Sequence, residues 1–238
     1  PQCKVYSYAV GEKDDYYADN VRVENGDIWF DFHTPDTRYP LSNIRLGVPV
    51  MVNVENSVAA MAVAWLMGAT AEELRSGVES FLGVRRRFDV HVNAPQVSYI
   101  DDYAHHPQEL AATIQSVKTL YPDRYVIAVF QPHLYSRTRD FADDFARVLS
   151  EMDEVVLLPI YPAREEPIAG VTSEWLMGRL GDEVKKVLAE PNVVGKYLRL
   201  RLKQCLAKGQ NVVVLTMGAG DIDQQVEDIK RNLTYKIL

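Results

Sequence analysis

The segment "YVIAVFQPHLYSRTRDFADDFARVLSEMDEVVLLPI", residues 125–160, determines the fold class of most of this chain. Two uninterrupted apolar runs, 125–130 and 154–160, enclose residues 139–151, whose apolar positions recur at helical spacing. Apolar strands that alternate with helices are typical of a parallel sheet covered by helices on both faces. The segment therefore predicts an α/β fold with a mostly parallel sheet.

The same alternation continues on both sides of this segment. Residues 88–92 and 97–101 are strand-like and flank a turn that contains Pro95, so they are predicted to pair as a hairpin. Further strands are predicted at 185–189 and 211–218, and further helices at 107–121, 173–180, 194–207 and 221–233.

Residues 1–87 show another order, in which short strands precede two helices. "DIWFDFH", residues 27–33, alternates with period two, whereas residues 56–68 form a compact apolar helix that Gly68 ends. Thr70 begins a second helix with a capping box, because Glu73 follows three residues later. We place a domain boundary near residue 88.

Composition excludes several classes of protein. The 238 residues carry a net charge of -7 and no run of Lys and Arg longer than the three arginines at 85–87, which argues against a broad nucleic-acid-binding surface. Two cysteines cannot form a disulfide framework or a four-thiolate zinc site. With no apolar stretch of about 18 residues and no signal peptide, we expect a cytoplasmic protein without a membrane span. The chain starts without Met, so we expect it to be part of a longer protein.

Three polar clusters follow predicted strands directly. They are "DDYAHH" at 101–106, "QPHLYSRTR" at 131–139 and "GAGD" at 218–221. Ligands of open parallel sheets bind at the carboxyl ends of the strands, so we expect the three clusters to converge there.

Each cluster also has a purely structural interpretation. The acids and imidazoles before Pro107 can cap a helix, and Asp221 can cap another. Arg137 has the paired donors that hold a carboxylate or phosphate, whereas Arg139 can be a solvated charge at a helix start.

A metal site is the weaker interpretation of the histidines. The chain has five histidines, and a two-metal hydrolase would need further acids at other strand ends, where "GAGD" supplies only Asp221. His105 and His106 are adjacent, so at most one of them is expected to enter a common site unless the backbone turns. None of these residues is predicted to bind a metal.

Five motifs resemble, in the same order, motifs of the Mur ligase family. The resemblance is to those members that join L-alanine to UDP-N-acetylmuramate in peptidoglycan synthesis. The five motifs are "RRRFD" (85–89), "DDYAHHPQE" (101–109), "FQPHLYSRTRDF" (130–141), "YPAREEPIAG" (161–170) and "GAGD" (218–221). The resemblance implies that residues 1–87 end a central ATP-binding domain and that 88–238 form a Rossmann-like C-terminal domain. No G-x-x-x-x-G-K-[ST] motif occurs in the chain, so the phosphate-binding loop is expected elsewhere.

The resemblance also implies roles in nucleotide binding for three residues. Asn56 matches the asparagine that reads adenine, Arg87 the arginine near the nucleotide phosphates, and Asp102 the aspartate that holds the ribose hydroxyls. ATP and Mg²⁺ are the implied cofactors, with the magnesium ligands mostly outside this chain.

Four further residues match the substrate side of the family site. His105 and His106 are expected to face the reaction centre, and Arg137 is expected to bind the carboxylate of L-alanine, with His133 beside it. In the implied reaction, ATP phosphorylates the lactyl carboxylate of UDP-N-acetylmuramate, and the amine of L-alanine attacks the acyl phosphate. Such a site must neutralise phosphoryl charge and orient the amine.

Two other functions stay open at this stage. One is a metal-dependent phosphoesterase that uses Asp101, Asp102, His105 and His106; the other is a non-catalytic amino-acid-binding module. Under the ligase interpretation we expect this chain alone to be inactive. The sequence leaves the oligomeric state open.

Overall fold

The computed structural model describes residues 3–24, 26–36 and 40–234. The chain divides into two compact units, Pro1–Gly83 and Val84–Leu238, here called the N-terminal and C-terminal units. This division lies close to the boundary predicted near residue 88. The outer ends of the two predicted domains, residues 1–2 and 235–238, lie outside the described residues.

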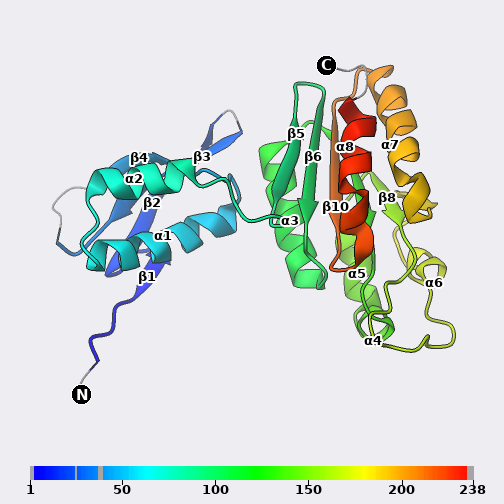
Figure 1. Cartoon of the computed structure of the whole chain (residues 1–238), viewed down its shortest axis with the longest axis horizontal. Helices are drawn as coiled ribbons and strands as arrows, with labels where there is room; N and C mark the ends of the chain where they lie inside the picture. The colour runs from blue at the N-terminus through cyan, green and yellow to red at the C-terminus, as the bar shows by residue number, and fades with distance from the viewer. Residues whose placement is uncertain (1–2, 25, 37–39, 235–238) are drawn as a thin grey trace. The chain divides into compact units, whose positions relative to one another are not determined.

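The N-terminal unit is a four-stranded sheet with two helices packed on it (Figure 1). Only the first two strands pair in parallel. The side chains of Ile28, Phe30 and Phe32 alternate into the core, as the period-two pattern predicts. The elements are β1 Tyr8–Val10, β2 Tyr16–Glu24, β3 Asp27–His33, β4 Leu41–Arg45, α1 Met51–Leu66 and α2 Ala71–Ser80.

The two helices of this unit begin for different reasons. α1 starts at Met51, before the predicted residue 56, because its buried face of Val54, Val58 and Met61 extends the packing toward its N-terminus. α2 has the predicted capping box: Thr70 Oγ1 accepts from the Glu73 N–H at 3.3 Å, and Glu73 Oε2 accepts from the Thr70 N–H at 2.8 Å.

The C-terminal unit contains a six-stranded sheet in the order β5-β6-β10-β7-β8-β9. All neighbours are parallel except β5 and β6, which form the predicted antiparallel hairpin. The predicted α/β fold with a mostly parallel sheet is therefore confirmed. The strands are β5 Asp89–Asn93, β6 Val97–Asp102, β7 Tyr125–Phe130, β8 Glu154–Leu157, β9 Lys185–Leu188 and β10 Val212–Met217.

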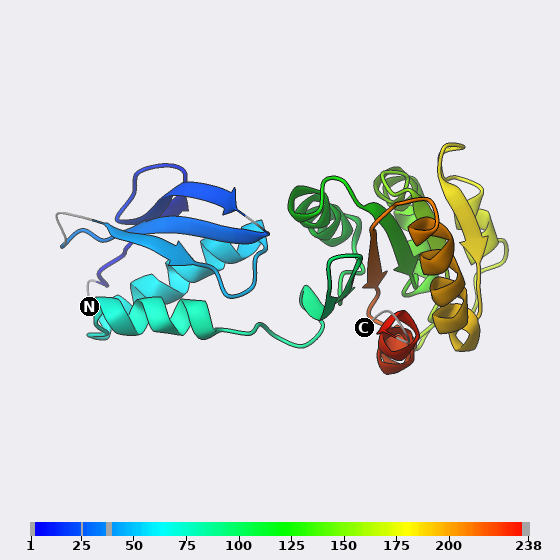
Figure 2. The same cartoon turned by 90° about the horizontal axis from the view of Figure 1, so that it is seen from above.

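Helices cover both faces of this sheet, as Figure 2 shows for α7 and α8 on one side and α3 on the other. The central strands are consequently buried on both sides, which explains their uninterrupted apolar sequence. The helices are α3 Pro107–Leu120, α4 Tyr135–Asp140, α5 Ala142–Leu149, α6 Ser173–Met177, α7 Pro191–Leu206 and α8 Val226–Thr234, and a 3₁₀ turn, Asp221–Gln225, precedes α8. Within the described residues, no helix is long and apolar enough to cross a membrane.

Two predicted helices differ from the observed ones. The helix expected at 139–151 is split into α4 and α5 at Phe141, whose backbone (φ -114°, ψ 20°) leaves helical geometry while its ring packs 4.7 Å from that of His106. The helix expected at 221–233 starts as a 3₁₀ turn. Asp221 does not cap it, because Asp221 is the first residue of the turn and Gly220 is the N-cap; the Asp221 carboxylate accepts a hydrogen bond from the Gln131 side chain.

Candidate functional site

The three polar clusters lie at neighbouring strand ends. β6, β10 and β7 are adjacent, and their last residues Asp102, Met217 and Phe130 are in register. The predicted convergence of the clusters is therefore confirmed. Their side chains belong to one edge of the sheet, where an open parallel sheet binds its ligands.

The carboxylate of Asp102 accepts hydrogen bonds from the backbone before β5 and after β6. Oδ2 accepts from the Phe88 N–H and Oδ1 from the Ala104 N–H, each at 2.8 Å. Burial raises the pKa of the Asp102 carboxyl, while these two hydrogen bonds oppose the rise. Each carboxylate oxygen has a second lone pair, so Asp102 retains capacity to accept a hydroxyl.

The adjacent histidines diverge. The ring of His105 lies 5.8 Å from that of His133, whereas His106 packs on Phe141. Helix α3 is capped by Glu109, whose Oε2 accepts from the backbone N–H groups of His105 (2.9 Å) and His106 (3.1 Å). Glu109 thus forms a capping box with His106, the N-cap residue, so the capping role considered for the Asp-His cluster is shared with Glu109.

The hydrogen bond of His105 defines its tautomer. Nδ1 lies 2.9 Å from the Tyr103 carbonyl oxygen, which can only accept, so Nδ1 carries a proton. Nε2 then has the lone pair of the neutral ring.

His133 and Arg137 form a pair at the end of β7. Arg137 Nη1 donates to His133 Nδ1 at 3.3 Å, which uses one of the five guanidinium N–H donors. Burial, the Arg137 charge and His105 all lower the pKa of His133. His133 is therefore held neutral beside a cation, and the remaining donors of Arg137 can bind an anion.

The motif at residues 161–170, to which no role was assigned from the sequence, supports this pair. Tyr161 stacks on His133 with ring centres 5.6 Å apart, and its carbonyl oxygen accepts from the Leu134 N–H. Glu165 Oε2 accepts from the Ser136 N–H at 2.9 Å. Hydrogen bonds from the Ser136 hydroxyl and from this N–H lower the pKa of the Glu165 carboxyl. Leu134 has φ 71°, a left-handed conformation for which these contacts on both sides compensate.

Gln131 is a site residue that sequence reasoning missed. Its Nε2 donates to Asp221 Oδ1 at 2.7 Å and its Oε1 accepts from the Ile222 N–H at 2.9 Å. The side chain thereby joins the end of β7 to the turn after β10. The available signal was its position as the first polar residue after an apolar strand.

Three other predicted residues have different surroundings. Arg139 is exposed and pairs with Asp140 at 2.7 Å, as expected for a solvated charge. Arg87 is exposed, with its guanidinium 5.9 Å from the centre of the Tyr103 ring. Asn56 belongs to the N-terminal unit, on α1, where its Nδ2 donates to Asn53.

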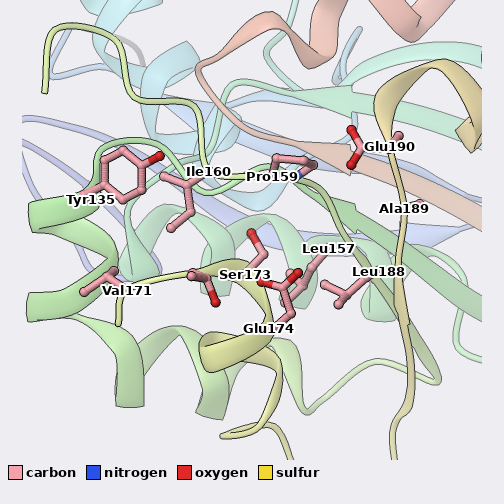
Figure 3. Close-up of a pocket in the computed structure, with 11 residues that line it drawn as sticks. Tyr135, Leu157, Pro159, Ile160, Val171, Ser173, Glu174, Leu188, Ala189 and Glu190 are labelled. Carbon is pink, nitrogen blue, oxygen red and sulfur yellow. The ribbon is translucent and has the colours of Figure 1, made fainter. Parts of the chain in front are cut away.

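A cavity of about 300 Å³ lies elsewhere in the C-terminal unit, at the carboxyl ends of β8 and β9 (Figure 3). Apolar side chains such as Leu157, Ile160 and Val171 line it, with Glu174 and Glu190 at its polar side. None of the seven predicted site residues lines this cavity.

The residues at the strand ends do not fit a magnesium site. In the part of the chain that the structure describes, no three His, Cys, Asp or Glu side chains are grouped to hold a metal ion. Both oxygens of the buried Asp101 carboxylate accept from protein side chains, Oδ2 from Arg86 and Oδ1 from Thr216.

Comparison with known proteins places the chain in a class. The profile of the family described as "Mur ligase, glutamate ligase domain" matches residues 86–220, more than half of the sequence. The chain belongs to the Mur ligase family.

Within this family, the chain is similar to ligases of one name. A UDP-N-acetylmuramate--L-alanine ligase from Parabacteroides distasonis is 50% identical over 98% of this chain and 48% of that protein. A protein of the same name from Phocaeicola vulgatus is 46% identical over 95% of this chain and 47% of its own length. The chain thus spans about half the length of the curated relatives it matches.

Solved structures support the fold. The crystal structure of UDP-N-acetylmuramate-alanine ligase from Thermotoga maritima superposes with a TM-score of 0.74 at 24% identity, covering 94% of this chain and 46% of that one. A MurF ligase from the same organism in complex with ADP has a TM-score of 0.65 at 19% identity, over 94% of this chain and 48% of that one. All these relatives are ligases, so the phosphoesterase and the non-catalytic module find no support among them.

Proposed function

We propose that this chain forms part of an ATP-dependent ligase that joins L-alanine to UDP-N-acetylmuramate in peptidoglycan synthesis. The 50% identity to a ligase of that name, over 98% of the chain, carries the proposal. Residues 1–87 would end the central ATP-binding domain and 88–238 would form the C-terminal domain. The protein would act in the cytoplasm, and Mg²⁺ would be held by residues outside this chain.

Arg137 is the proposed anchor for the carboxylate of L-alanine. Its fork of donors matches a carboxylate, and neutral His133 orients the guanidinium without adding a second cation. Arg137 lies in α4, which follows β7, and its guanidinium contacts His133 in the segment between them. Because β7 neighbours β10, and β10 neighbours β6, an amino acid bound there would lie near the strand ends.

His105 is the proposed acceptor for the proton of the alanine ammonium. The amine must be free before it attacks an acyl phosphate, and His105 has its lone pair on Nε2. His106, which packs on Phe141, would support the loop rather than touch the substrate. This division assigns the two adjacent histidines different roles.

The nucleotide would be held by Arg87 near the phosphates, Asp102 at the ribose and Asn56 at adenine. The remaining lone pairs of Asp102 permit this role alongside its two backbone contacts. Arg87 is exposed and therefore accessible to a phosphate.

The test uses a completed ligase, defined as this chain joined to the N-terminal half of the Parabacteroides distasonis relative. Arg137→Lys should raise the KM for L-alanine roughly 10- to 100-fold, because a charged hydrogen bond contributes about 1.5–3 kcal/mol and lysine loses the paired geometry. The KM for ATP should change little.

Arg139→Lys is the matched control, since Arg139 is exposed and pairs with Asp140, the next residue in the chain. Equal effects of the two substitutions would refute the carboxylate assignment. A completed ligase that folds but releases no ADP in the presence of L-alanine and UDP-N-acetylmuramate would refute the proposed function.

A further inference from the structure

The C-terminal unit opens with a turn whose backbone is unusual. Arg86 has φ 62° and Phe88 has φ 48°, so two residues that are not glycine adopt left-handed conformations on either side of Arg87. Such conformations cost free energy and persist only where surrounding contacts overdetermine them. The structure should therefore show what holds residues 84–88 in place.

Hydrogen bonds to backbone groups hold the turn at Val84, Arg86, Arg87 and Phe88. Arg87 N–H donates to the Val84 carbonyl oxygen at 3.0 Å, and Arg86 N–H donates to Asp89 Oδ2 at 3.2 Å. The Arg86 carbonyl oxygen accepts from the Tyr103 N–H at 2.7 Å. The Phe88 N–H donates to Asp102, and the Phe88 ring is buried.

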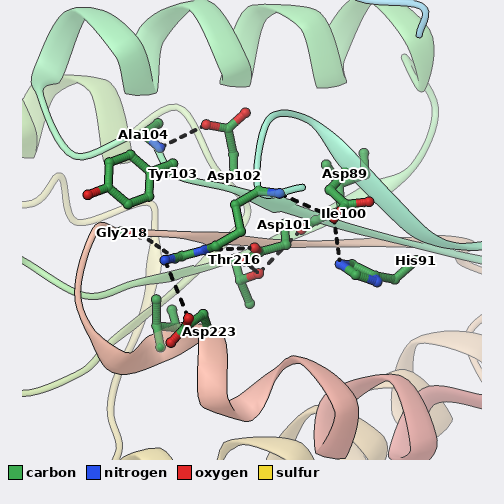
Figure 4. A network of polar contacts seen from close by, with 12 residues as sticks. Asp89, His91, Ile100, Asp101, Asp102, Tyr103, Ala104, Thr216, Gly218 and Asp223 are labelled. Atoms are coloured by element: carbon green, nitrogen blue, oxygen red, sulfur yellow. Dashed lines mark hydrogen bonds and ion pairs between the residues drawn. The ribbon is translucent and has the colours of Figure 1, made fainter. Parts of the chain in front are cut away.

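The side chain of Arg86 extends the restraint into the sheet, where Figure 4 labels its partners Asp101, Gly218 and Asp223. Nε donates to Asp101 Oδ2 at 3.2 Å, Nη2 donates to the Gly218 carbonyl oxygen at 2.5 Å, and Nη1 lies 3.9 Å from Asp223 Oδ2. Asp101 is completely buried, and its other oxygen accepts from Thr216 Oγ1 at 2.6 Å. Arg86 thus ties the turn to the carboxyl ends of β6 and β10.

The neighbouring arginine is oriented differently. Nε and Nη2 of Arg86 donate to protein acceptors and Nη1 faces Asp223, so its guanidinium is directed into the C-terminal unit. Arg87 is exposed. Both guanidinium groups lie over the Tyr103 ring, at 5.1 Å for Arg86 and 5.9 Å for Arg87.

We propose that Arg86 and Asp101 are positioning residues: their buried ion pair holds the left-handed turn so that Arg87 is presented to the nucleotide phosphates. The inference rests on the proposed function only for the identity of the ligand of Arg87. The restraint of the turn by the Arg86–Asp101 pair does not depend on that ligand and is tested separately by hydrogen exchange.

The first experiment measures amide hydrogen exchange in the 238-residue chain. Arg86→Lys keeps the charge but cannot reach Asp101 and Gly218 together, so exchange at Arg87, Phe88 and Tyr103 should accelerate by about tenfold or more. Core amides such as that of Val156 should not change.

The matched control is Arg201→Lys, which weakens another buried ion pair, with Glu154 at 2.6 Å, at the start of β8. It should leave exchange at Arg87 and Phe88 unchanged. Unchanged exchange at these amides in Arg86→Lys would overturn the proposal. If Arg86→Lys does not fold, the double variant Arg86→Gln/Asp101→Asn, which buries no unpaired charge, is measured with the same expectation.

The second experiment is a double-mutant cycle in the completed ligase. Arg86→Lys should raise the KM for ATP about tenfold with kcat within about threefold, because it acts through Arg87. In the Arg87→Ala background, adding Arg86→Lys should change the KM for ATP by less than about twofold. Equal effects in both backgrounds would show a merely structural role and overturn the proposal.

The two failures are distinguishable. An inactive completed ligase refutes the proposed function, and the exchange measurement still decides whether the pair holds the turn. An active completed ligase whose KM for ATP is insensitive to Arg87→Ala refutes the role of Arg87 and, with it, the positioning role.

Discussion

Gly220 lies in the turn after β10, and its replacement by alanine tests how tightly the strand ends are packed. A Cβ atom there would lie 2.5 Å from Gln131 Oε1 and 2.7 Å from both Cβ and Cγ of Tyr161. These distances are too short for van der Waals contact, so the surroundings must move. Tyr161 Cβ is fixed to its backbone, and moving Gln131 Oε1 breaks its hydrogen bond from Ile222.

The size of the effect follows from these contacts. Overpacking costs about 1–3 kcal/mol, and the loss of the hydrogen bond adds about 0.5–1.5 kcal/mol. Gly220→Ala should therefore destabilise the C-terminal unit by roughly 2–4 kcal/mol. For a chain of this size, the melting temperature should fall by roughly 4–16 °C.

Urea and thermal unfolding, followed by circular dichroism, measure the effect against a matched control. Gly178 follows α6 with φ -62° and ψ -12°, and a Cβ there would lie 3.6 Å from its nearest neighbours. Gly178→Ala should be neutral or stabilising by about 0.4–1 kcal/mol, because alanine restricts the unfolded chain. If Gly220→Ala is as stable as Gly178→Ala, the inference that Gly220 has no room for a Cβ atom is refuted.

Two further predictions use charged groups of the C-terminal unit. Arg137→Ala should raise the pKa of His133 toward its ordinary value, because an adjacent cation is removed; NMR titration measures this, and an equal rise in Arg139→Ala would contradict it. Burial raises the pKa of the Glu154 carboxyl, but hydrogen bonds led by those of Arg201 outweigh burial and lower it. A lowered carboxyl pKa stabilises the fold above the ordinary value of about 4.3 and loses this effect as pH falls through the folded-state pKa. Glu154→Gln should thus cost roughly 3–5 kcal/mol near pH 7 and progressively less below about pH 4 in urea unfolding; a constant difference would refute the linkage.

The outline of the C-terminal unit was predictable because it depends on local patterns. Uninterrupted apolar runs such as residues 125–130 are required of strands buried on both faces, and helical spacing marks the segments between them. Parallel strands place their carboxyl ends at one edge, so the convergence of the three polar clusters followed from their order alone.

The break between α4 and α5 was not predictable in the same way. Residues 139–151 have helical periodicity throughout, yet Phe141 leaves helical geometry where its ring meets His106. The contact joins the segment that follows β6 to the helices that follow β7. Local propensity contains no information about such a partner.

By itself, the sequence determined the strand and helix alternation, the place where the polar clusters meet and the family motifs that the comparisons bear out. Only the tertiary structure decided the direction of each side chain within those clusters. In "RRRFD", Arg86 points inward to Gly218, 132 residues away in sequence, while Arg87 is exposed. A left-handed turn has no periodicity from which side-chain direction can be read, and the hydrogen bonds that stabilise it come from residues distant in the chain.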